Sequence, residues 1–339
     1  MFRRALFAVT LVAVSFALIQ SSQVAESPRA ISVIASKIDA FEMRDQTRVR
    51  FGDLEFRGAL ELTSKERDFG GLSALLIDPD GERFLSLSDK GRWFRGRIVY
   101  RDGRPVGVDD VETAPMLGAD GTPLSARGWY DTESLAQDGG AVYVGIERVN
   151  QIVRFDYGKD GLMARGEPID LPPQAKALPF NKGIEALAFI PRGRPQGFEL
   201  AGTLIAMSER GLDSNGNILA FLIGGQRPGA FSIRRIGDFD ISDATVLPGG
   251  DVVLLERSYS PAKGVGMRMR RVRQSDIKPG AVVDGRVMVE ADMGYQIDNM
   301  EGVAVHRNAQ GETILTVISD DNFSPIQRTL LIQFALVAE

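Results

Sequence analysis

The stretch DTESLAQDGGAVYVGIER, residues 131–148, contains the pattern on which the fold prediction rests. It opens with polar and acidic residues and a short apolar run. A Gly-rich turn follows, and a second apolar run ends in an acidic and a basic residue. Two antiparallel strands joined by a tight turn have this pattern. The stretch therefore predicts a β-hairpin with charged residues at its open end, where the first strand starts and the second strand ends.

The same pattern occurs five times along the 339 residues. The five openings are Gly71-Leu72-Ser73-Ala74-Leu75, Asp131-Thr132-Glu133-Ser134-Leu135, Gly183-Ile184-Glu185-Ala186-Leu187, Ile241-Ser242-Asp243-Ala244-Thr245 and Asn299-Met300-Glu301-Gly302-Val303. The matching second strands end in Ser88-Asp89-Lys90, Ile146-Glu147-Arg148, Ser208-Glu209-Arg210, Leu255-Glu256-Arg257 and Ser319-Asp320-Asp321. The second acids recur at intervals of roughly 47 to 64 residues, which is the scale of one four-stranded propeller blade.

Third strands can be placed after every hairpin, and fourth strands after all but the last. The last repeat runs out of chain after its third strand, at residues 329–336. The segment LEFRGALELTS, residues 54–64, can supply the missing strand and close the ring. We therefore predict an all-β chain folded as a β-propeller of about five four-stranded blades, closed by an N-terminal strand. Six blades, or a β-sandwich, are the alternatives.

The N-terminus has the pattern of an export signal. Arg3 and Arg4 precede an apolar run of about 15 residues, which is short for a membrane span. The predicted organisation is a signal peptide over residues 1–25, an N-terminal lead-in over 26–47 and the propeller over 48–339. An uncleaved anchor is the alternative. We expect the protein to be periplasmic or secreted, with no membrane contact beyond the signal segment.

Composition excludes several kinds of chemistry. The chain has no Cys and a single His, His306, which rules out thiol catalysis and multi-His metal sites. A serine triad could use only His306, and no G-x-S-x-G motif accompanies it. The net charge of −5 gives no reason to expect a nucleic-acid partner.

The acidic residues of the repeats predict the candidate site. The two ends of each hairpin are neighbours, so these acids should gather around one mouth of the central channel. Hard oxygen ligands without His or Cys favour Ca²⁺, with Mg²⁺ as the alternative. The candidate metal ligands are Asp89, Glu133, Glu147, Glu185, Glu209, Asp243, Glu256, Glu301 and Asp320. The candidate anion-binding residues are Lys90, Arg148, Lys182, Arg210 and Arg257. The alternative role for any of these residues is to hold adjacent blades together.

At these residues the chain resembles a bacterial phytase-like family known as "esterase-like activity of phytase". The matching pieces are GGLSAL (70–75), FLSLSDKG (84–91), DTESLA (131–136), NKGIEALAF (181–189), MSERG (207–211) and DNMEGVAV (298–305). The resemblance covers residues 45–337. It implies an exported propeller that hydrolyses phosphate or carboxyl esters, and it supplies no catalytic residues.

The leading hypothesis is an exported, metal-assisted hydrolase of a small anionic ester, acting in the central funnel. Base and nucleophile stay unassigned. A calcium-dependent lactonase is a second enzyme hypothesis. A non-catalytic periplasmic propeller that binds a ligand or partner is the alternative from a different class. The sequence leaves the oligomeric state open.

Overall fold

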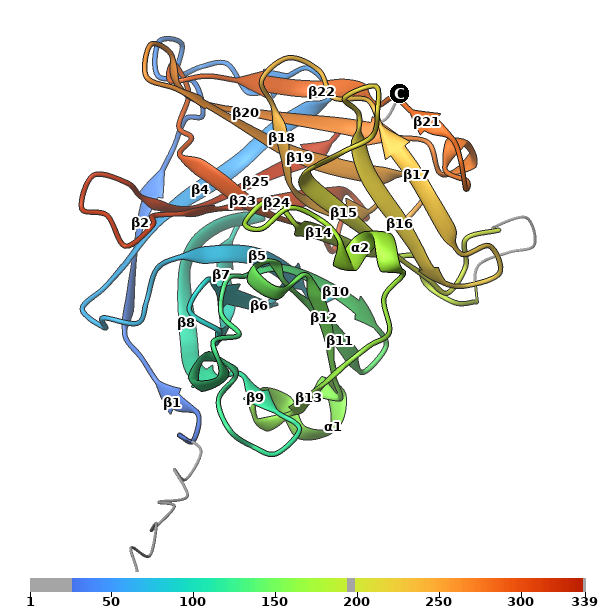
Figure 1. Ribbon diagram of the computed structural model, residues 1–339. Helices are drawn as coiled ribbons and strands as arrows, with labels where there is room; N and C mark the ends of the chain where they lie inside the picture. Colours follow the sequence, from blue (N-terminus) through green and yellow to red (C-terminus); the bar gives the residue numbers. More distant parts are fainter. Residues whose placement is uncertain (1–25, 194–198, 338–339) are drawn as a thin grey trace, which may run out of the picture.

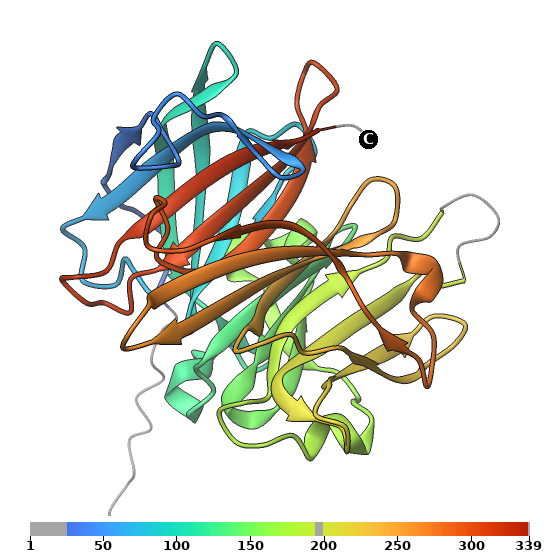
Figure 2. The same ribbon diagram turned by 90° about the horizontal axis from the view of Figure 1, so that it is seen from above.

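The computed structural model describes residues 26–193 and 199–337, and within them the chain forms five antiparallel sheets arranged in a ring (Figures 1 and 2). In each sheet the strand nearest the axis contacts the corresponding strands of the two neighbouring sheets, and these contacts close the circle. The chain is therefore a five-bladed β-propeller, as predicted. The predicted signal segment, residues 1–25, lies outside the described residues.

The strands of each blade follow one another outward from the channel. Blade I contains β5 (Leu72–Ile77), β6 (Arg83–Ser88), β7 (Arg92–Arg101), β8 (Arg104–Pro115) and β1 (Arg29–Ala30). Blade II contains β10 (Thr132–Asp138), β11 (Ala141–Ile146), β12 (Gln151–Phe155), β13 (Arg165–Pro168) and β9 (Leu117–Gly118). Blade III contains β14 (Ile184–Phe189), β15 (Thr203–Leu212), β16 (Ile218–Gly224), β17 (Gly229–Ile233) and β21 (Val282–Val283).

Blades IV and V complete the ring. Blade IV contains β18 (Asp240–Val246), β19 (Val252–Ser260), β20 (Gly264–Val272) and β22 (Arg286–Ala291). Blade V contains β23 (Asn299–Arg307), β24 (Thr313–Asp320), β25 (Thr329–Leu336), β4 (Leu54–Ser64) and β2 (Val33–Ile38), with β3 (Arg50–Phe51) paired to β4. Short helical turns connect strands at α1 (Tyr157–Asp160), α2 (Pro173–Lys176), η1 (Leu124–Arg127), η2 (Glu147–Val149), η3 (Gly161–Met163) and η4 (Gln274–Asp276).

The ring closes where the N-terminal and C-terminal strands meet. Strand β4 pairs antiparallel with β25, from Leu62 opposite Thr329 to Leu54 opposite Leu336. Figure 1 shows this as a blue strand beside a red one. The prediction that residues 54–64 complete the last blade is therefore confirmed. The lead-in adds two more strands, because β2 extends blade V beside β4 and β1 pairs with the outer strand of blade I.

The hydrophobic core is divided among the interfaces between blades. Five clusters of buried apolar side chains are found among the described residues, and each cluster takes its members mainly from two adjacent blades. Between blades I and II, for example, the rings of Trp93 and Phe155 meet edge to face at 5.1 Å. The ring therefore depends on sheet-to-sheet packing, which explains how it can do without disulfides. Within the described residues no helix is long and apolar enough to cross a membrane.

Candidate functional site

Every inner strand carries one β-bulge near its start, and in blades II, III and V the bulge residue lines the channel cavity. The register between first and second strands shifts at the same position in all five blades. A bulge leaves one residue unpaired and redirects its side chain. We call the five bulge residues the first ring: Ser73, Glu133, Glu185, Ser242 and Glu301.

A second ring of side chains lies on or just after the second strands, next to the residues that pair with the start of each inner strand. These residues directly follow the partners of Leu72, Thr132, Ile184, Ile241 and Met300. In three blades the backbone N–H of the second-ring residue donates a hydrogen bond of 2.9–3.0 Å to the carbonyl two residues before the bulge. The second ring consists of Asp89, Glu147, Glu209, Arg257 and Asp320.

The two rings line one cavity of about 920 Å³ at this mouth of the channel. Three acids of the first ring and every member of the second ring border it. Lys182 and Arg328 add positive charge, and Asn181, Asn299 and Asn322 add amides. The structure thus brings together seven of the nine predicted metal ligands and two of the five predicted anion-binding residues. The seven acids are Asp89, Glu133, Glu147, Glu185, Glu209, Glu301 and Asp320.

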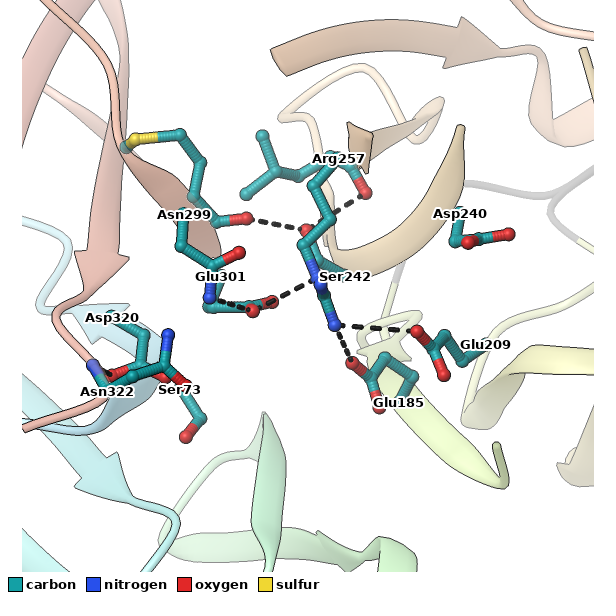
Figure 3. A network of polar contacts seen from close by, with 12 residues as sticks. Ser73, Glu185, Glu209, Asp240, Ser242, Arg257, Asn299, Glu301, Asp320 and Asn322 are labelled. Atoms are coloured by element: carbon teal, nitrogen blue, oxygen red, sulfur yellow. Dashed lines mark hydrogen bonds and ion pairs between the residues drawn. The ribbon is translucent and has the colours of Figure 1, made fainter. Parts of the chain in front are cut away.

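Arg257 stands among three of the glutamates (Figure 3). Its Nε lies 3.0 Å from Glu301 Oε1, and its Nη2 lies 3.4 Å from Glu209 Oε1 and 3.7 Å from Glu185 Oε1. The negative charge of Glu301, followed by that of the other glutamates, raises the pKa of Arg257 further above its usual range despite burial. This half of the cavity already holds its counter-charge, and we call it the paired half.

In the opposite half of the cavity no basic side chain forms an ion pair with the acids in the described part of the chain, although the charge of the neighbouring Lys90 partly lowers the pKa of Asp89. The carboxylate of Glu133 has no ion pair or hydrogen bond there, and Asp89 Oδ1 is buried without a donor. Burial raises the pKa of Glu133 well above its ordinary range, and nearby acids raise it further. Burial also raises the pKa of Asp320 to about 8 and that of Asp89 to about 6. We call Glu133, Asp89 and Asp320 the unpaired half.

Glu147 lies at the junction of the two halves. Its Oε1 accepts a hydrogen bond of 3.0 Å from the Gly183 N–H, and burial raises its pKa to about 7, helped by the nearby Glu209. Lys182 Nζ lies 2.5 Å from Glu209 Oε2, so this lysine reaches the cavity wall from the side of blade III. A carboxylate with a pKa near neutrality can both accept and donate a proton at physiological pH.

The predicted positions of Asp243 and Glu256 are wrong because the fourth repeat is displaced by one residue. Its bulge residue is Ser242, and its second-ring residue is Arg257. Successive side chains of a strand point to opposite faces, so a one-residue error turns both acids away from the mouth. Asp243 accepts a hydrogen bond of 2.8 Å from the Val303 N–H, which ties blade IV to blade V.

Glu256 is fully buried within blade IV instead of lining the channel. It faces β20, where the Nε atoms of Arg268 and Arg270 lie 2.6 and 2.9 Å from its Oε2. The negative charge of Glu256 is therefore neutralised by the two arginines inside the blade. For these two acids, the structure supports the structural role that the sequence left as the alternative.

Three of the predicted anion-binding residues also point elsewhere. Lys90 Nζ lies 3.0 Å from the centre of the Phe323 ring, and the Arg148 guanidinium lies 4.4 Å from that of Tyr130. Arg210 donates to Asp240 at 2.8 Å. These cations are held by aromatic rings or by an acid beside the mouth, and none of the three lines the cavity. Lys182 and Arg257 are the two that do.

Sequence reasoning missed several residues of the cavity. Asp131, Asp298 and the three asparagines line it, as does Arg328, which is anchored to Gln296 Oε1 at 3.0 Å. Asp131 and Asn181 precede the bulges of blades II and III with positive φ, at 62° and 55°. An Asp or Asn two to four residues before the bulge position of a repeat is a signal that could have marked them.

The donor chemistry of the unpaired half fits a hard cation such as Ca²⁺, since carboxylates and amides supply only oxygen ligands. As they stand, no three acidic or His side chains in the described part of the chain lie close enough together to share one ion. A cation would therefore require Glu133, Asp89 and Asp320 to turn toward one another. Burial is the chief cause of their raised pKa values, with a smaller contribution from nearby acids, and a bound cation would stabilise the ionised carboxylates against both effects.

A family model described as "Phytase-like: Esterase-like activity of phytase" matches residues 67–323, which include both rings. The chain belongs to this family. The match confirms the resemblance seen in the sequence and supports a hydrolase-like propeller in general terms. No protein with curated function matches the chain.

Three solved structures resemble the chain at low sequence identity. An α-L-arabinofuranosidase from Podospora anserina, solved with cellotriose, has 9% identity and a TM-score of 0.45 over 84% of this chain and 97% of its own. The N-terminal domain of Nup159 has 11% identity and a TM-score of 0.40 over 90% of this chain and 100% of its own. The WD40 domain of Neurospora crassa Pan2 has 11% identity and a TM-score of 0.37, over 86% and 97%.

Proposed function

We propose that this protein is an exported, cation-assisted hydrolase of phosphate or other esters, and that the reaction takes place in the cavity between the two rings. The observation that carries the proposal is the division of one cavity into a paired and an unpaired half. Acids with pKa values near neutrality stand beside Arg257 and Lys182, which are suited to an anionic group.

Within this proposal the residues have different tasks. Glu147 is the candidate general base, because its pKa of about 7 leaves it partly ionised at neutral pH and one of its oxygens is held by the Gly183 N–H. Arg257 and Lys182 orient the anionic part of the ester. Arg257 is itself fixed by the paired glutamates, so it does not need to reorganise when substrate binds.

The unpaired half is the proposed cation site. Glu133, Asp89 and Asp320 would hold a Ca²⁺ or Mg²⁺ ion, and such an ion supplies Lewis-acid polarisation of the ester oxygen and a more acidic bound water. Once ionised, the three acids carry three negative charges, and no basic side chain forms an ion pair with them in the described residues, so a divalent cation that displaces their protons would leave a small net charge.

The experiment is a hydrolysis assay on purified mature protein with a panel of phosphomonoesters, carboxyl esters and lactones. We expect one class to be hydrolysed, with activity lost in EDTA and restored by Ca²⁺. Glu147→Gln should lower kcat about 100-fold or more, as loss of a general base does. Asp110→Asn, a substitution of an acid with a 69% exposed side chain, is the control and should keep full activity.

A second candidate function is a non-catalytic propeller that binds a ligand in the same cavity. The side chains of Asp243, Ser242 and Thr132 form hydrogen bonds to the backbone of an adjacent blade. These bonds favour a structural role for the polar residues of the repeats. If no ester in the panel is hydrolysed but cations or ligands still raise the melting temperature, this second function is the better account.

A further inference from the structure

Three exposed apolar side chains stand around the opening of the acidic cavity. Tyr259 lies near the end of β19, Met293 follows β22, and Ile326 lies in the loop between β24 and β25. All three line the cavity, yet they keep 69%, 53% and 89% of their surface exposed. Single exposed apolar residues are common on proteins, but three that converge on one cavity are a feature of that cavity. We call them the apolar rim.

The backbone around the rim is held in place. Gly264, at the turn after Tyr259, has a φ of +74°, and a Cβ at this position would come within 2.7 Å of Met293 Cγ. The glycine therefore lets Met293 pack against the β19–β20 hairpin. The loop that carries Ile326 is fixed at its base, where the Arg328 N–H donates to Asp298 Oδ2 at 3.1 Å. The rim is thus built from three separate segments of blades IV and V.

The interior that the rim surrounds is acidic overall. Acids from both rings, together with Asp131 and Asp298, outnumber the three basic residues Lys182, Arg257 and Arg328. A ligand with many phosphate groups would meet repulsion there, because like charges at short range raise the free energy of the complex. A ligand with one small polar head would meet much less.

We propose that the substrate is an ester with a single polar head and an apolar alkyl, acyl or aryl group. The head enters among the carboxylates, and the apolar group lies on Tyr259, Met293 and Ile326. This inference rests on the proposed function, since it names the substrate class of the same cavity. Complete burial of a methylene raises affinity about fourfold, and the one-sided contact with the rim should give about half of that factor, roughly twofold.

The test is calorimetric binding of butyl, hexyl and octyl phosphate in Ca²⁺, with glycerol 2-phosphate as the polar compound of the same head group. For the wild-type protein we expect affinity to rise about tenfold or more from butyl to octyl phosphate. The combined variant Tyr259→Ser, Met293→Ser and Ile326→Ser should lose this dependence on chain length. The control Ile34→Ser, at a 60% exposed position on β2, should keep it.

Several outcomes would overturn the inference. One is equal affinity for all chain lengths, or tighter binding of glycerol 2-phosphate. Another is an unchanged dependence on chain length in the rim variant. If that variant instead loses binding to phospholipid vesicles, the rim is a membrane contact. Chain-length-dependent binding without hydrolysis of any ester would contradict the proposed function and leave the rim assignment standing.

Discussion

At the scale of single residues, Arg257 decides how the charges of the cavity are arranged. Four blades place an acid in the second ring, and blade IV places Arg257 there. Its guanidinium reaches Glu185, Glu209 and Glu301. Glu185 and Glu301 are the first-ring residues of blades III and V, and Glu209 is the second-ring residue of blade III. The second ring is therefore not uniformly acidic. The arginine at its blade IV position divides the cavity into a paired and an unpaired half.

Arg257→Gln should destabilise the protein strongly at pH 8 and much less at pH 5. The variant leaves the buried carboxylates of Glu185 and Glu301 without their cation, whereas Glu209 keeps Lys182. Burial raises the pKa values of Glu185 and Glu301, so both can be protonated at pH 5. We expect a loss of about 2 to 4 kcal/mol at pH 8, somewhat less than is usual for breaking a fully buried ion pair, because the Arg257 side chain keeps 30% exposure. Urea denaturation at both pH values measures this.

Arg210→Gln is the matched control for that experiment. Arg210 pairs with Asp240, but its side chain is 49% exposed and Asp240 keeps a second partner in Arg235. The expected loss is below about 1 kcal/mol, with little change between pH 5 and pH 8. Equal losses in the free energy of unfolding for the two arginine variants would show that Arg257 forms only ordinary surface ion pairs.

At the scale of elements, the sequence pattern is enough to predict hairpins, blades and the closing strand. In residues 299–337, for example, apolar runs and turns indicate three strands and the fourth is missing. Residues 54–64 have the pattern of that missing strand. The bulge cannot be read, because a bulge is a matter of register and leaves no distinct residue type. Ser242 and Arg257 break the acidic pattern of the other repeats, so the pattern points to the neighbouring Asp243 and Glu256 instead. Of the cavity asparagines, Asn181 and Asn322 lie in connecting segments, and only Asn299 belongs to a repeat opening.

Leu60→Ala should show how much the closing strand contributes. Leu60 is fully buried at the centre of β4, in the cluster between blades V and I. The lost contacts and the cavity left behind should cost about 2 to 5 kcal/mol in the free energy of unfolding. Ile34→Ala, in β2 of the same sheet but 60% exposed, should cost less than about 0.5 kcal/mol. Similar losses for the two variants would mean that β4 does not hold the ring closed.

At the scale of the whole molecule, the propeller gathers one residue from each end of five hairpins into a single mouth. The geometry raises the pKa of several acids at once, chiefly by burial. A folded state that binds protons more tightly than the unfolded chain is more stable at low pH. The contribution of these acids to the stability of the cation-free protein therefore becomes less favourable as pH rises.

The pH window follows from the individual groups. The pKa of Asp320 rises from 3.8 to about 8 and that of Glu147 from 4.5 to about 7. The unfavourable contribution of Asp320 therefore grows from about pH 4 to pH 8, and that of Glu147 from about pH 4.5 to pH 7. The slope is on the order of 1 kcal/mol per pH unit for each group.

Asp320→Asn should flatten this dependence. In EDTA the variant should be more stable than the wild type at pH 8 and no more stable at pH 5, as measured by urea denaturation. Asp110→Asn, at an exposed position, should leave the wild-type slope unchanged. Equal pH slopes in the wild type and in Asp320→Asn would show that burial in the cavity does not raise the pKa of Asp320 in this way.

The central claim is that the unpaired half of the cavity holds a divalent cation, and thermal unfolding in EDTA and in millimolar Ca²⁺ tests it most directly. A ligand that binds only the folded state raises the melting temperature, so Ca²⁺ should raise that of the wild type. Glu133→Gln removes a charge from the unpaired half. It should melt higher than the wild type in EDTA and gain much less from Ca²⁺, whereas Asp110→Asn should respond like the wild type. No Ca²⁺ response in the wild type, or an equal response in Glu133→Gln, would contradict this claim.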